Sequence, residues 1–253
     1  ALAGRGTGPG LWHTVQHEGF HQFVVMVIGG RMPVWANEGM AEYFGQGLWT
    51  GDGFVTGTIP QAKLELLRRY IRTGRLMDFE DFLSMSPSQW RGAFSNNDKD
   101  KDQNKDKDKG DGDRVKINYI QAWSIVHFLV HAENGKYRQS FSGFITDISA
   151  GKSWKAAVLE RFGSNVKGFE QKCRDWWLSL PDNPTRDLYI EAEAATLTSY
   201  FARAVSQGQG FKDAGQFLRR AKAGELKANP AQKLPDSLLD RALDEATSTS
   251  GTA

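Results

Sequence analysis

The chain has 253 residues, of which 40% are hydrophobic and 11% aromatic, with 8 Trp and 15 Phe. This composition is sufficient for a packed core and predicts a globular protein. A formal net charge of +2 gives no field that would indicate nucleic acid or anionic lipid as a partner. The single cysteine, Cys173, excludes an internal disulfide and a cysteine-based zinc site. The longest apolar run, Phe23 to Ile28, is far below the roughly 20 residues that span a bilayer.

Helical patterns dominate the first part of the chain. Residues 11–28 lack proline and precede a pair of glycines, which predicts a helix. A second helix is expected to begin at Pro33 and to end around residues 45–47. Near residues 48–57, turn glycines alternate with aromatic and β-branched residues, a pattern typical of a short hairpin or an irregular loop. Apolar spacing and glycine stops predict two further helices, at 61–72 and 78–85.

Residues 95–113 contain no apolar side chain. Such a segment cannot bury enough surface to repay the entropy of ordering, so a disordered insertion is expected here. Its aspartate spacing has a loose similarity to a calcium loop. However, the closing bidentate glutamate is missing and the alternating lysines would repel the ion. A calcium-binding, regulatory role for this segment is therefore the least favoured interpretation.

The second half is also predicted to be helical. A strongly apolar helix covers 119–129 and ends near residues 134–135, and Pro181 and Pro184 then mark a boundary. Further helices are expected at 136–149, 153–162, 165–179, 187–206 and 211–222, with a frayed end after Ala246. The predicted class is thus mainly α, with one domain at 1–180 and a C-terminal helical extension at 181–253.

The most informative motif is His17-Glu18-Gly19-Phe20-His21, in the first predicted helix. Residues four apart on a helix differ by about 40° around the axis and about 6 Å along it. His17 and His21 therefore project from one face and can bind one ion, which suits tetrahedral zinc with Zn–N distances of about 2.0–2.1 Å. Glu18 is turned about 100° from His17, where it can hold a water without being a ligand.

A catalytic zinc needs a third protein ligand, and Glu38 is the candidate. It lies on the second predicted helix, which a short connection makes a neighbour of the first. Glu42, one turn later, is expected either to accept the free N–H of a ligating histidine or to be an exposed charge. Gly39 costs about 1 kcal/mol relative to Ala inside a helix. Its presence suggests that a side chain there would hinder close approach of the helices or of substrate.

The remaining histidines are not expected to be ligands. His13 continues the four-residue ladder of His17 and His21, but a straight helix separates His13 from His21 by about 12 Å, too far for all three to bind one ion. His127 is surrounded by apolar residues and is expected in the core, whereas His131 is expected at the surface.

The pattern His-Glu-x-x-His, followed on the next helix by Trp-x-x-Glu-Gly-x-Ala-x-Tyr, resembles the gluzincin zinc metallopeptidases, the superfamily of thermolysin and the zinc aminopeptidases. The resemblance implies that His17, His21 and Glu38 bind zinc and that Glu18 is the general base. The family often has an acidic residue one turn after the glutamate ligand, which supports the first histidine, and Glu42 matches it.

Residues 11 to about 180 also resemble a little-characterised group of bacterial peptidase-like domains in this superfamily. Their later helix tends to read Tyr-x-x-Ala-Trp-x-x-x-x-Phe-Leu, which is matched here by Tyr119, Ala122, Trp123, Phe128 and Leu129. Gluzincins stabilise the oxyanion with a downstream Tyr or His, and Tyr119 is the expected one, unless it only packs at a helix start. A β-sheet usually precedes the zinc helix, but only about ten residues do so here, which predicts zincin-like helices without an evident N-terminal sheet.

Two functions remain open from the sequence. The first is zinc-dependent hydrolysis of a peptide or protein substrate, and the second is a non-catalytic module in which zinc ties two helices together. Both require Zn²⁺, and an open coordination position favours the enzyme. The family resemblance suggests a cell-envelope or extracellular location. Because the sequence opens on Ala1 with a glycine-rich stretch, we expect it to be a piece of a longer precursor.

Overall fold

The computed structural model describes residues 9–29, 31–90, 108–226, 234 and 236–250. Within these residues the chain is mainly helical and its strands form one two-stranded antiparallel sheet, which confirms the predicted class and the short hairpin. Two compact units can be distinguished. The larger contains the described residues of Trp12–Gly47 and Thr56–Thr185, and the smaller contains residues 9–11, Leu48–Val55 and the described residues from Arg186 onward. No described helix is both long and apolar enough to cross a bilayer.

The two helices that carry the expected ligands are α1 (Pro9–Val27) and α2 (Val34–Gly45). Just after α1, Gly29 has a φ of +79°, a left-handed conformation that glycine adopts without steric cost. Pro33, with φ of −63°, directly precedes α2, as expected from its fixed dihedral. The apolar side of α1 packs on α2 through a small cluster that is separate from the main core and comprises Phe20, Val24, Ile28 and Ala41.

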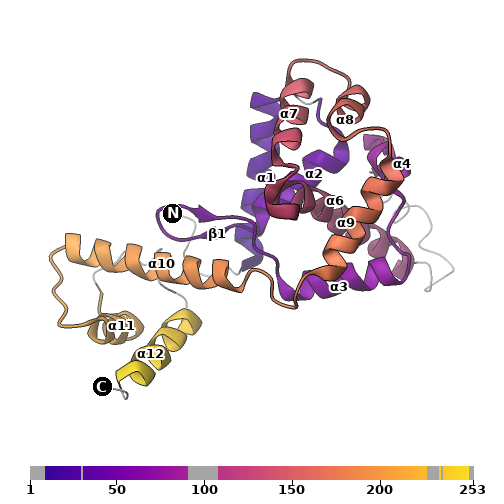
Figure 1. The fold of residues 1–253 in the computed structure, drawn as a ribbon. Helices are drawn as coiled ribbons and strands as arrows, with labels where there is room; N and C mark the ends of the chain where they lie inside the picture. Colours follow the sequence, from indigo (N-terminus) through magenta and orange to yellow (C-terminus); the bar gives the residue numbers. More distant parts are fainter. Residues whose placement is uncertain (1–8, 30, 91–107, 227–233, 235, 251–253) are drawn as a thin grey trace. The chain divides into compact units, whose positions relative to one another are not determined.

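Helix α6 (Asp108–Gly135) runs through the middle of the larger unit (Figure 1). It contacts α2, α3 (Gln61–Arg72), α7 (Arg138–Ser149) and α9 (Val166–Ser179). Two shorter helices, α4 (Phe79–Leu83) and α8 (Trp154–Phe162), also belong to this unit. The main core lies around α6 and includes the fully buried side chains of Trp123, Phe128, Phe144 and Trp177.

Gly39 allows α2 to lie close to α6. A Cβ at this position would be 2.4 Å from the carbonyl oxygen of Ala122 and 2.7 Å from Cγ2 of Val126. Both distances are far inside van der Waals contact, so only glycine fits without a shift of one helix. The close approach of α6 therefore imposes the requirement for glycine at this position.

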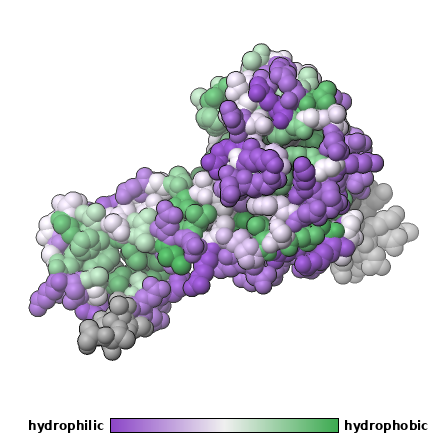
Figure 2. Space-filling view, viewed as in Figure 1, coloured by the Kyte–Doolittle hydropathy of each residue, from purple (hydrophilic) through white to green (hydrophobic). Residues whose placement is uncertain are grey.

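Among its described residues, the smaller unit contains a hairpin and three helices. Strands β1 (Leu48–Trp49) and β2 (Phe54–Val55) pair antiparallel, and Arg203 of α10 (Arg186–Ser206) donates a hydrogen bond of 2.6 Å to the carbonyl oxygen of Gly51. Helices α11 (Ala214–Lys222) and α12 (Asp236–Ser250) pack together through their own apolar cluster. Apolar surface is nevertheless visible over this unit in Figure 2.

Two expectations about disorder were wrong where the structure describes the residues. Helix α6 begins at Asp108, so residues 108–113 of the expected insertion are helical, whereas 95–107 lie outside the described residues. Helix α12 was not predicted, and it continues to Ser250, past Ala246 where a frayed end was expected. In both cases a polar segment adjoins a helix that has a buried apolar side, and extending an existing helix avoids the cost of nucleating a new one.

Candidate metal centre

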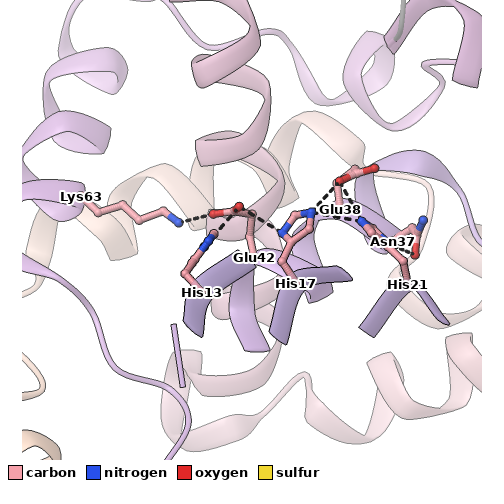
Figure 3. A network of polar contacts seen from close by, with 7 residues as sticks. All are labelled: His13, His17, His21, Asn37, Glu38, Glu42 and Lys63. Atoms are coloured by element: carbon pink, nitrogen blue, oxygen red, sulfur yellow. Dashed lines mark hydrogen bonds and ion pairs between the residues drawn. The ribbon is translucent and has the colours of Figure 1, made fainter. Parts of the chain in front are cut away.

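Helices α1 and α2 bring the three expected ligands together (Figure 3). The Nε2 atoms of His17 and His21 are 3.1 Å apart. Oε2 of Glu38 lies 3.5 Å from Nε2 of His17 and 3.4 Å from Nε2 of His21. One potential ligand atom from each residue therefore occupies a corner of a nearly equilateral triangle.

This triangle has the dimensions of one face of a zinc tetrahedron. With bonds of about 2.05 Å, tetrahedral ligand atoms are about 3.3 Å apart, and the observed edges are 3.1, 3.4 and 3.5 Å. Oε2 of Glu38 is buried and, among the described residues, makes these ion-pair contacts but no well-formed hydrogen bond. A bound cation would compensate for that burial. Two histidines and one glutamate also leave a fourth position for water in catalytic zinc sites.

Glu42 lies on the other side of the His17 ring. Its Oε1 is 3.3 Å from Nδ1 of His17 and 3.5 Å from Nε2 of His13, and its Oε2 accepts a hydrogen bond of 2.6 Å from Nζ of Lys63. Glu42 is buried, so it is not an exposed charge. Burial alone would raise its pKa, but the three basic neighbours hold it well below the usual range. The ionised carboxylate can therefore fix the tautomer of His17 that leaves Nε2 available to a metal.

The two carboxylates also control the charge of His17. Burial lowers the pKa of this histidine, but Glu38 and Glu42 outweigh burial and raise the pKa to about 9. A metal binds the neutral imidazole, so loading the site would release the proton that His17 otherwise holds at neutral pH.

Two residues of this network were not found by sequence reasoning. Oδ1 of Asn37 lies 3.2 Å from Nδ1 of His21, where it can accept the ring N–H and leave Nε2 available. Its position directly before Glu38 on α2 was the available signal. Lys63 gave no such signal, because its contact with Glu42 depends on how α3 packs in three dimensions.

Tyr119 of α6 lies beside the site, with its ring centroid 6.0 Å from that of His17. Burial, followed by the charge of Glu38, raises its pKa to about 12, although a hydrogen bond from Trp90 acts in the opposite direction. The phenol therefore remains a protonated donor at neutral pH. Glu18 is exposed on α1 and is not part of the network in Figure 3, but its charge also contributes to raising the pKa of Tyr119.

The two histidines of α6 form a separate cluster. His127 is buried as predicted, with Nε2 3.1 Å from the carbonyl oxygen of Gly57. Burial, together with the neighbouring His131, lowers the pKa of His127 to about 3. His131 was expected at the surface, but it is half-buried, because α2 packs on α6 and places the hydroxyl of Tyr43 2.8 Å from Nε2 of His131.

The structure thus gathers His17, His21, Glu38 and Glu42 in one network, with Tyr119 next to it. Glu18 lies on the exposed side of α1, the helix that carries both histidines. No family model, curated protein or solved structure matches the chain. The assignment of a function therefore depends on the geometry of this site.

Proposed function

We propose that this protein is a zinc-dependent hydrolase of peptide bonds with a gluzincin-type site. The observation that carries the proposal is the triangle of Nε2 of His17, Nε2 of His21 and Oε2 of Glu38. Glu42 and Asn37 support it, because each approaches the opposite nitrogen of one ligating ring. Such contacts fix ring orientation and are typical of metal sites.

Zinc bound by these residues would supply a Lewis acid that polarises the scissile carbonyl and lowers the pKa of a water molecule. Glu18 accepts a proton from the attacking water and passes it to the leaving amine as the C–N bond breaks. Tyr119 donates a hydrogen bond from its phenolic O–H to the oxyanion that develops on the carbonyl oxygen. The water ends as the hydroxyl of the new carboxyl group and the hydrogen on the amine, so the products are a carboxylic acid and an amine.

The Glu18→Gln variant separates metal binding from turnover. Because Glu18 is not a ligand, the variant should retain one zinc per chain, while hydrolysis of a diverse peptide library should fall by about 100-fold or more. The matched variant Glu38→Gln should lose both zinc and hydrolysis. Unchanged turnover in Glu18→Gln would contradict the role of this residue, and full zinc retention in Glu38→Gln would contradict the metal site itself.

A non-catalytic, zinc-stabilised module is the second candidate function. One observation favours it: the buried apolar side of α1 forms only a small cluster, distinct from the main core. An ion shared by α1 and α2 would then hold α1 in place. Under this alternative, zinc would raise the melting temperature of the natural chain, but this chain would not hydrolyse any member of the peptide library.

A further inference from the structure

A second set of potential ligands lies next to the first. His13, His17 and Glu42 each offer one potential ligand atom, and these atoms lie within 4.8 Å of one another. Oε1 of Glu42 faces Nε2 of His13 and Nδ1 of His17. We call these three atoms the inner set, and Nε2 of His17, Nε2 of His21 and Oε2 of Glu38 the outer set. His17 belongs to both through opposite ring nitrogens. A neutral imidazole has one free lone pair, so it can serve only one of the two sets at a time.

The inner set brings a carboxylate close to two imidazoles. Its carboxylate oxygen is 3.3 Å from Nδ1 of His17 and 3.5 Å from Nε2 of His13, close to the edges of the outer set. The ring of His13 lies against Gly45, where a Cβ would be 2.9 Å from Nε2. Glycine therefore makes room for this ring. Since the side chain of His13 is 32% exposed, ions from solvent can reach it.

Lys63 distinguishes the two sets. Its Nζ donates a hydrogen bond of 2.6 Å to Oε2 of Glu42 and lies 4.6 Å from the ring centroid of Trp123, and its side chain is 14% exposed. The ammonium is thus fixed on two sides. A divalent ion on Oε1 of Glu42 would face this ammonium across a single carboxylate, where little water screens the repulsion. In the described part of the chain, no lysine or arginine is paired with Glu38.

We propose that Lys63 is a specificity residue that excludes a divalent ion from the inner set and so directs the ion to the outer set. Its ammonium neutralises Glu42, which then positions His17 instead of binding metal. This inference rests on the proposed zinc site, but it assigns a further property: which of two adjacent ligand sets the ion selects.

Zinc affinity, measured by competition with a chromophoric chelator, tests the proposal without reference to activity. His21→Ala breaks the outer set and should weaken binding at least tenfold. Adding Lys63→Met should recover at least tenfold in affinity, because the inner set can then accept the ion. A third substitution, His13→Ala, should abolish this gain. The control is Lys63→Arg in the His21→Ala background, which retains the positive charge and should recover nothing.

Two results would overturn the proposal: no gain on adding Lys63→Met to a folded His21→Ala chain, or a gain that survives His13→Ala. If the Lys63→Met chain is not folded by circular dichroism, Lys63→Gln removes the charge and retains a donor toward Glu42, and the same comparison applies. The outcome is independent of turnover. A Glu18→Gln variant that remained active would refute the proposed hydrolysis but would leave this competition between ligand sets intact.

Discussion

The Gly39→Ala substitution should displace a helix that carries a metal ligand. The new Cβ would lie 2.4 Å from the carbonyl oxygen of Ala122. Because a close C···O contact is about 3.3 Å, α2 and α6 must separate locally by about 0.9 Å. Overpacking costs about 1–3 kcal/mol, and the replacement of glycine by alanine inside a helix returns about 1 kcal/mol. Since the clash is with rigid backbone, we expect a net loss of about 1–2 kcal/mol in the free energy of unfolding.

Urea unfolding in the presence of chelator measures this loss of stability. A repeat with zinc tests whether the shift also moves Glu38 away from the two histidines and so weakens the stabilisation by bound zinc. The stability difference from the unsubstituted chain should be larger with zinc. The matched control is Gly19→Ala, another helix-interior glycine directly after a glutamate, where a Cβ meets nothing within 4 Å. This control should gain about 1 kcal/mol. A Gly39→Ala chain as stable as the unsubstituted one would refute the packing argument.

Two further predictions concern the charges around the site and the core. Glu42→Gln retains the shape of the side chain but removes its charge. Zinc should therefore bind about 10–100-fold more weakly, as measured by competition with a chelator. An unchanged affinity would show that Glu42 does not support His17. Burial lowers the pKa of His127 to about 3 from the usual 6.5 of a histidine. Between these values only the unfolded chain takes up the proton, so lowering the pH from about 7.5 to about 5 should cost about 2 kcal/mol through this residue. Urea unfolding in chelator at both pH values should show a smaller loss for His127→Gln, and an equal loss would contradict the assignment.

Much of the fold could be predicted because glycine, proline and apolar spacing act locally. The helix expected at 61–72 is α3, Gln61–Arg72, and the helix expected after Pro33 is α2. The early start of α6 could not be predicted, because residues 108–113 have no apolar periodicity and become helical only as an extension of a buried helix. Composition indicates the entropy cost of ordering a segment on its own, but it does not indicate how far a neighbouring helix reduces that cost.

The site was partly predictable for the same reason. The four-residue spacing of His17 and His21 specifies one helix face, and the short connection to α2 limits where Glu38 can lie. The contact of Asn37 with His21 could not be predicted, because it depends on how α2 is oriented toward α1, which residue spacing alone does not provide. Lys63 lies 21 residues after Glu42 on a different helix, so only the packing of the larger unit reveals that its ammonium meets that carboxylate.

The unequal attachment of the two ligand helices has a thermodynamic consequence. Helix α2 packs along α6 in the main core, whereas the buried side of α1 belongs to a small separate cluster. An ion shared between them would couple its own affinity to the packing of α1 on α2. This coupling is reciprocal: the factor by which packing of α1 raises the affinity for the ion equals the factor by which the bound ion favours the packed position of α1. Any molecule that steadies the solvent-facing side of α1 would therefore strengthen metal retention without contacting a single ligand atom.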